Sequence, residues 1–146
     1  MDFLLAQDQA TQQRFVDLEQ TIQTDTQVYL ADSMGEMWLW YALSQACFVG
    51  GSLNEPGGGH NILEPMVLDV PTVIGPRYFN FQAIVDEFLQ ADAVKVGQTV
   101  DEVIELLVRC VEDQDFSQQL SQHAVEVLNR NKGSLQKHIA VIDRYL

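Results

Sequence analysis

Residues 46–65 read ACFVGGSLNEPGGGHNILEP, and this stretch decides the fold. Its first four residues are a continuous apolar run, which is typical of a strand covered on both faces of a parallel sheet. Five glycines follow between positions 50 and 59. The next segment, HNILEPMVLD, predicts a helix in which Pro65 lies near the first turn, because a proline deeper inside would remove a backbone hydrogen bond. The stretch therefore predicts a strand, a glycine loop and a helix in succession.

The same alternation continues along the chain. Three further short strands are predicted in QVYLAD (27–32), VPTVIG (70–75) and AVKV (93–96). Helices are predicted over about 35–45, in NFQAIVDEFLQ (80–90) and in TVDEVIELLVRCVED (99–113). Ser33 and Glu36 have capping-box spacing at the start of the first of these helices, and Thr99 and Glu102 have it at the start of the third. A loosely started helix is predicted over 2–23, and two more over 115–131 and 134–146, separated by Gly133.

Strands that alternate with helices predict an α/β fold, a Rossmann-like parallel sheet with flanking helices and a helical C-terminus. We expect one domain over residues 1–146, with a βα core at 27–97 that carries the glycine loop and C-terminal helices at 98–146. In such sheets ligands bind at the carboxyl ends of the strands, and the glycine loop follows one of these ends.

Charge restricts the partners. The chain has 8 Lys and Arg against 21 Asp and Glu, a formal charge of -13. This balance argues against nucleic-acid binding and against anionic membranes. The sequence contains no apolar stretch of about 18 residues and no signal peptide, so we expect no membrane insertion by this chain. Cys47 and Cys110 lie in apolar surroundings and predict buried thiols in a reducing, cytoplasmic compartment.

An anionic ligand would have to be held locally, and the glycine loop is the candidate. Glycine allows a ligand to approach the backbone and allows positive φ, and amides at the start of the next helix can bind phosphate. Asn61 and Glu64 are three residues apart, so they share a helix face on which one offers an amide and the other accepts from sugar hydroxyls. The loop is neither a P-loop, since no Lys follows, nor a dinucleotide fingerprint. The alternative is a glycine loop that only makes turns.

Three motifs together, LADSMGEM (30–37), FVGGSLNEPGGGHNILEP (48–65) and VIGPRYFNF (73–81), resemble the C-terminal half of 3-deoxy-D-manno-octulosonic acid (Kdo) transferases. These are GT-B glycosyltransferases of lipopolysaccharide inner-core synthesis. The ending KGSLQKHIAVIDRYL (132–146) also resembles that family, whereas 1–26 does not. The resemblance implies a CMP-Kdo-binding domain without the family's N-terminal acceptor domain.

The resemblance also implies a set of site residues and roles. Around the nucleotide and sugar phosphate it places Ser33, Met34, Gly35, Glu36, Gly51, Ser52, Gly58, Gly59, His60, Asn61 and Glu64, with Glu64 accepting from the ribose. Arg77 would pair with the Kdo carboxylate, the alternative being a solvated loop arginine. The family is metal-independent, and its general base is expected in the N-terminal domain. The donor would be CMP-Kdo and the acceptor a lipid A precursor (lipid IVA).

From this resemblance we expect the full-length enzyme at the cytoplasmic face of the bacterial inner membrane and no turnover by this chain alone. Two other hypotheses stay open at this point. One is another GT-B transferase that uses a different nucleotide sugar, and the other is a non-catalytic interaction module.

Overall fold

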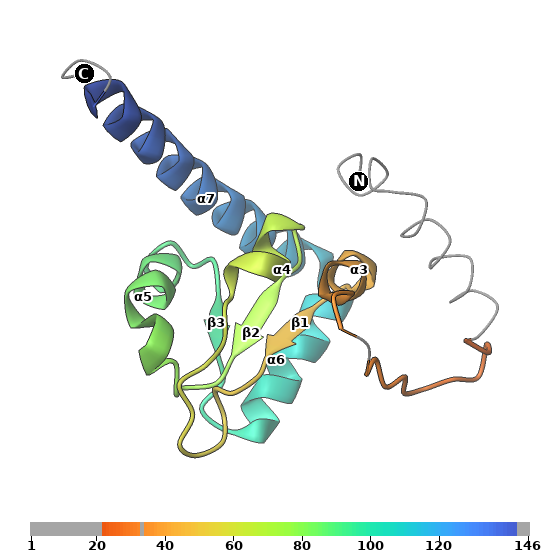
Figure 1. Ribbon diagram of the computed structural model, residues 1–146. Helices are drawn as coiled ribbons and strands as arrows, with labels where there is room; N and C mark the ends of the chain where they lie inside the picture. The colour runs from red at the N-terminus through yellow and green to blue at the C-terminus, as the bar shows by residue number, and fades with distance from the viewer. Residues whose placement is uncertain (1–21, 33, 143–146) are drawn as a thin grey trace.

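A computed structural model describes residues 22–32 and 34–142 of the chain. Its centre is a parallel sheet of β1 (Cys47–Val49), β2 (Thr72–Ile74) and β3 (Lys95–Val96), in the order β1-β2-β3. Phe48 lies opposite Val73, and Ile74 opposite Val96. Figure 1 shows the three strands side by side with helices on both faces. The predicted α/β class with a parallel sheet is confirmed.

Helices connect and cover the strands. They are α3 (Met37–Leu43), α4 (Leu63–Val67), the 3₁₀ turn η1 (Phe79–Phe81), α5 (Gln82–Gln90), α6 (Val100–Glu112) and α7 (Gln114–Ile142). Pro65 is the third residue of α4, within its first turn as predicted. In the part of the chain that the structure describes, no helix is both long and apolar enough to cross a membrane.

The alternation of side chains along the strands builds two cores. Val49 and Ile74 point to one face, where they pack with α4, α5 and α7 through Met66, Phe88 and Val127. Phe48 and Val73 point to the other face, where α6 covers them with Val103 and Cys110. Both faces of the central strand are therefore buried, which explains the continuous apolar runs in the sequence.

Three side chains fix where α6 and α7 begin. The hydroxyl of Thr99 accepts from the amide of Glu102 at 3.2 Å, and the carboxylate of Glu102 accepts from the amide of Gln98 at 2.7 Å. The capping pair predicted at Thr99 and Glu102 is confirmed. The pair predicted at Ser33 and Glu36 is not, because α3 begins after Glu36 without a side-chain cap and Ser33 lies outside the described residues. Asp113 accepts from the amide of Phe116 at 3.0 Å, and this hydrogen bond holds the pKa of Asp113 below its usual value.

Two predicted elements are wrong. Residues 27–32 form no strand, and Val28 and Leu30 are exposed. A short apolar alternation needs a neighbouring strand, and none of the described strands lies beside it. The two C-terminal helices are one helix, α7, which runs through Gly133. A glycine inside a helix costs only about 1 kcal/mol, so the preference for a break was too weak to decide. The predicted helix at 2–23 lies almost wholly outside the described residues.

Candidate functional site

The glycine loop lies where two neighbouring strands end. Residues 50–61 connect the carboxyl end of β1 to α4, and residues 75–80 follow the carboxyl end of β2. The two segments are joined by backbone hydrogen bonds, from Arg77 to Ser52 at 2.9 Å, from Gly58 to Arg77 at 3.0 Å and from Asn80 to Gly58 at 3.1 Å. This is the edge of the sheet at which α/β proteins bind ligands.

The glycines allow these segments to pack against each other. Gly57 and Gly58 have φ of 79° and 114°, in the region that disfavours a side chain. A Cβ on Gly57 would lie 2.5 Å from Cβ of Arg77, and one on Gly58 would lie 2.3 Å from Nδ2 of Asn80. The close approach that requires glycine here is that of the protein's own chain.

This packing overturns one expectation about the backbone donors. The amide of Gly58 donates to the carbonyl of Arg77, and the amide of Gly59 donates to that of Gly51 at 2.9 Å. Neither amide is open to a phosphate in this conformation. The contribution of the helix macrodipole to anion binding is also small, because α4 has only five residues and its few peptide dipoles sum to a weak macrodipole.

Ser52 was expected to offer a hydroxyl beside the sugar phosphate. Its side chain is instead fully buried, with 1% of the residue exposed. The hydroxyl donates to the carbonyl of Val49 at 2.9 Å and accepts from the amide of Gly75 at 2.8 Å. It therefore ties the end of β1 to the residue that follows β2, and it faces the interior.

The backbone amides of the next two residues, His60 and Asn61, differ from those of Gly58 and Gly59. Among the described residues, the amides of His60 and Asn61 have no acceptor within hydrogen-bond distance. The His60 ring lies against Gly51, since a Cβ there would be 2.9 Å from Cδ2 and Nε2 of the imidazole. His60 is exposed. Open donors thus lie one step beyond Gly59, next to the two glycines whose amides are paired.

Asn61 and Glu64 lie close together, but they do not share a helix face as predicted, because α4 begins at Leu63 and Asn61 precedes it. The side-chain amide of Asn61 donates to Oε1 of Glu64 at 3.4 Å, and its oxygen accepts from the amide of Leu63 at 3.1 Å. Burial chiefly raises the pKa of Tyr41, and the charges of Cys47 and Glu64 raise it further. Helix α3, which carries Tyr41, packs beside α4, which carries Glu64, a contact between elements that the sequence did not reveal.

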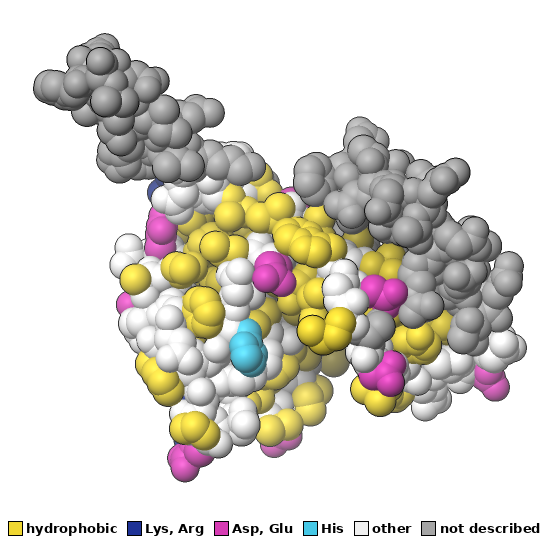
Figure 2. Space-filling model, in the orientation of Figure 1, with side chains coloured by type: hydrophobic (Ala, Val, Ile, Leu, Met, Phe, Trp, Pro, Cys, Tyr) yellow, Lys and Arg dark blue, Asp and Glu magenta, His cyan; other side chains and the backbone are white. Residues whose placement is uncertain are grey.

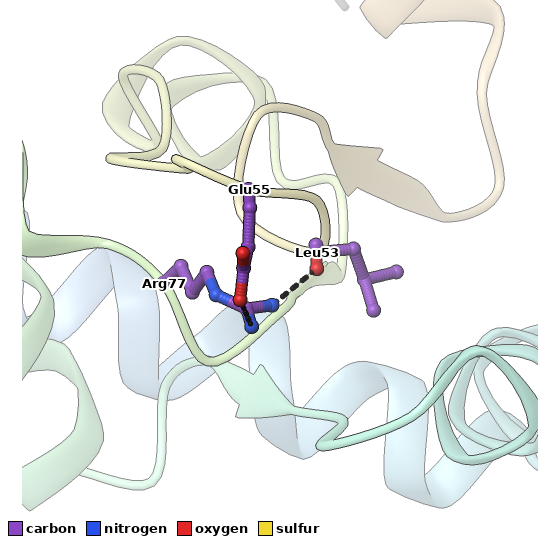
Figure 3. A network of polar contacts seen from close by, with 3 residues as sticks. All are labelled: Leu53, Glu55 and Arg77. Carbon is purple, nitrogen blue, oxygen red and sulfur yellow. Dashed lines mark hydrogen bonds and ion pairs between the residues drawn. The ribbon is translucent and has the colours of Figure 1, made fainter.

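Arg77 holds the outer part of the loop. Its guanidinium donates to the carbonyl of Leu53 at 2.7 Å and to the carboxylate of Glu55 at 2.8 Å (Figure 3). The side chain thus braces its own loop while staying 39% exposed, and its role towards the Kdo carboxylate stays a prediction. Glu55 is largely exposed, so the ion pair itself contributes little, about 0–1 kcal/mol.

Met34 and Gly35 are not assembled with the loop in the same way. Ser33 lies outside the described residues. Met34 is 96% exposed, and nothing lies within 4 Å of a Cβ built on Gly35. Among the described residues, Met34 and Gly35 make no hydrogen bond to the loop. Glu36 precedes α3 and is half-buried.

Two side chains that touch the glycines were missed by sequence reasoning. Cβ of Tyr78 lies 3.3 Å from where a Cβ on Gly59 would be, and the side chain of Asn80 lies against Gly58. Both residues belong to the motif VIGPRYFNF, but the pattern within one segment does not predict which other segment it contacts. Arg77 is the one Lys or Arg within 48–65 and 75–82. Figure 2 likewise shows acidic and hydrophobic side chains, and hardly any Lys or Arg, on the face in view.

The cysteines stand apart from this chemistry. Both are free; Cys110 is buried as predicted, and Cys47 is half-buried. Burial raises the pKa of Cys47 to about 11 and also raises that of Cys110. The thiols are therefore protonated at neutral pH, which disfavours nucleophilic roles.

Comparison with known proteins gives this geometry a context. The chain is similar to the 3-deoxy-D-manno-octulosonic acid transferase of Haemophilus influenzae, with 37% identity over 123 residues, 84% of this chain and 29% of the relative. It is also similar to that of Chlamydia muridarum, with 29% identity over 109 residues, 75% of this chain and 25% of the relative. The chain thus spans less than a third of the length of either relative. No model of a known protein family matches it.

A solved structure matches as well. The crystal structure of the C-terminal CMP-Kdo binding domain of WaaA from Acinetobacter baumannii superposes with a TM-score of 0.73 and 62% sequence identity. The match covers 77% of this chain and 58% of that domain.

Proposed function

We propose that the chain, which belongs to the 3-deoxy-D-manno-octulosonic acid transferase family and corresponds to its C-terminal domain, binds the CMP part of CMP-Kdo at the glycine loop. The observation that carries this proposal is the 62% identity to a domain described as CMP-Kdo binding. The position of the loop, at the carboxyl ends of β1 and β2, supports it.

The loop geometry supports particular roles for several groups. The backbone amides of His60 and Asn61, which have no acceptor among the described residues, would donate to the phosphate. Glu64, oriented by its hydrogen bond from Asn61, would accept from the ribose hydroxyls. The buried Ser52 and the paired amides of Gly58 and Gly59 would hold the loop in shape instead of contacting the nucleotide.

Arg77 would bind the sugar part of the donor. Its hydrogen bond to Leu53 fixes the guanidinium, and its ion pair with Glu55 is exposed. A ligand carboxylate that replaces that of Glu55 would exchange one charge-assisted hydrogen bond for another. We propose this exchange as the way in which the Kdo carboxylate is held.

The transfer reaction belongs to the larger protein. In that reaction an acceptor hydroxyl attacks the anomeric carbon of Kdo while CMP departs, and donors at the phosphate stabilise the charge on the leaving group. The general base that deprotonates the acceptor is expected in the part of the relatives that this chain does not match. We propose a lipid A precursor as acceptor, no metal requirement, and a location at the cytoplasmic face of the inner membrane for the full-length enzyme.

Calorimetric titration of the chain with CMP tests the nucleotide site. CMP should bind, and UMP and GMP should bind more weakly. Glu64→Ala should weaken CMP binding by about 1–3 kcal/mol, because it leaves polar groups of the ligand without a partner. Glu105→Ala, which removes an exposed carboxylate from α6, is the matched control and should leave the affinity unchanged.

The result also separates the alternatives. Equal or tighter binding of another nucleotide favours a different GT-B transferase. Binding of no nucleotide favours a non-catalytic module in which the glycines only serve packing. An affinity unchanged by Glu64→Ala removes Glu64 from the site while leaving the rest of the proposal standing.

A further inference from the structure

Three aromatic residues, Tyr78, Phe79 and Phe81, follow the carboxyl end of β2. Tyr78 and Phe81 pack against the first core. Phe79, the first residue of η1, is instead 59% exposed. An exposed phenylalanine alone needs no explanation, because folded proteins leave much apolar surface in contact with water. The position of Phe79 beside the glycine loop, however, calls for one.

The ring of Phe79 lies against the glycine loop. A Cβ built on Gly58 would lie 3.4 Å from Cε2 of the ring, which is an ordinary contact distance. The backbone around the ring is held on both sides, because Gly58 donates to the carbonyl of Arg77 at 3.0 Å and accepts from the amide of Asn80 at 3.1 Å. These two hydrogen bonds bracket Phe79, so its place beside the loop is set before any ligand binds.

Polar groups without partners lie near this ring. The backbone amides of His60 and Asn61 have no acceptor among the described residues, and the side-chain amide of Asn80 has no partner there either. His60 is two residues beyond Gly58, so the Cα atoms of the two lie within about 7 Å of each other. A ligand bound at the open amides would therefore be within reach of the ring of Phe79.

The order of the groups along the loop matches the order of the parts of the donor. CMP-Kdo consists of cytidine, a phosphate and Kdo, joined in that order. In the proposed function, on which this inference rests, Glu64 accepts from the ribose and the amides of His60 and Asn61 bind the phosphate. Along the chain, Gly58 lies on the other side of these amides from Glu64. The ring that packs on Gly58 is therefore on the side of the sugar.

Kdo has an edge that an aromatic ring can contact. It is a 3-deoxy sugar, so its carbon 3 carries two hydrogens and no hydroxyl. C–H groups pack favourably on an aromatic ring, whereas a hydroxyl buried there would lose its hydrogen bonds to water. The carboxamide of Asn80 is next to Phe79 in the sequence and can bond to the hydroxyls that the sugar does have. An aromatic surface with a polar side chain beside it is the usual composition of a small-molecule site.

We propose that Phe79 is a specificity-determining residue for the sugar of the donor, and that its exposed ring packs against the 3-deoxy edge of Kdo. Arg77, two residues earlier, would hold the carboxylate of the same sugar. An ion pair and an apolar contact would then select a deoxy sugar acid together. The ring does not touch CMP in this arrangement, so Phe79 should affect the affinity for CMP-Kdo and not the affinity for CMP.

Calorimetric titration of the chain with CMP and with CMP-Kdo tests the proposal. Phe79→Ala should raise the Kd of CMP-Kdo by about three- to tenfold and leave the Kd of CMP unchanged. Phe79→Tyr should keep the parent affinity for both compounds because it retains the ring.

A second exposed apolar side chain gives the matched control. Ile104, on α6, is 52% exposed, and Ile104→Ala should change the Kd of neither compound. The thermal unfolding of Phe79→Ala should stay close to that of the parent chain, because the side chain is exposed. A difference between the two ligands in one variant is a result that a merely structural role of Phe79 would not produce.

Three results would overturn the proposal while CMP still binds the parent chain. The first is an unchanged Kd of CMP-Kdo in Phe79→Ala. The second is an equal loss of affinity for CMP and CMP-Kdo in that variant, and the third is a parent chain that binds CMP but not CMP-Kdo. If the parent chain binds neither compound, the proposed function fails and this inference fails with it.

Discussion

Replacing Ser52 with alanine should destabilise the domain without opening a ligand contact. The hydroxyl is buried and makes two hydrogen bonds, to the carbonyl of Val49 and from the amide of Gly75. Each such bond contributes about 0.5–1.5 kcal/mol, and the buried amide left without an acceptor adds a penalty of about 1–3 kcal/mol. We expect a loss of about 2–4 kcal/mol in the free energy of unfolding.

Urea unfolding followed by circular dichroism measures this loss, provided that the denaturant dependence of the free energy stays unchanged. Ser44→Ala is the control, because that hydroxyl donates to the carbonyl of Trp40 at the exposed end of α3. It should cost less than about 1 kcal/mol. If Ser52→Ala costs no more than Ser44→Ala, the hydroxyl does not tie the strand ends together and our account of the loop is wrong.

Three further changes probe other parts of the fold. Gly57→Ala should cost about 2–4 kcal/mol in unfolding free energy, because φ is 79° and a Cβ would meet Cβ of Arg77. Gly50→Ala, in open space, should cost less than about 0.5 kcal/mol. Equal effects of the two substitutions would contradict the packing described. Thr99→Ala should cost about 0.5–2 kcal/mol by removing the cap of α6, and Thr99→Ser should restore most of it. Because burial raises the pKa of Cys47 from 9.0 to about 11, its contribution to stability is complete below pH 9 and is lost as the pH rises towards 11. Stability measured across that range should therefore fall more steeply in the parent chain than in Cys47→Ala, and parallel curves would argue against a buried thiol.

Local patterns predicted the elements that tertiary packing confirms. The run ACFV and the segment VPTVIG became β1 and β2 because both are buried on two faces, and Thr99 capped α6 because a cap depends on residues within one turn. The strand predicted at 27–32 failed because a strand also needs a partner. The break at Gly133 failed because one glycine does not outweigh a long helix.

The site was predictable in place but not in detail. The strand–loop–helix pattern predicted its position, and the spacing of Asn61 and Glu64 predicted that they lie close together, although Asn61 precedes α4 instead of sharing a helix face with Glu64. The hydrogen bond from Gly58 to Arg77 joins residues far apart in the sequence, and no local pattern indicates which carbonyl an amide will meet. The glycines were therefore assigned to a ligand, whereas four of their neighbours in space belong to the segment from Arg77 to Asn80.

Amide resonances observed during titration of the labelled chain with CMP test the central proposal most directly. We predict that the largest shifts fall on His60, Asn61 and Glu64, and that the amides of Gly58 and Gly59 keep their slow hydrogen exchange because they stay bonded to Arg77 and Gly51. An absence of shifts across residues 50–64 at millimolar CMP would contradict nucleotide binding at this loop.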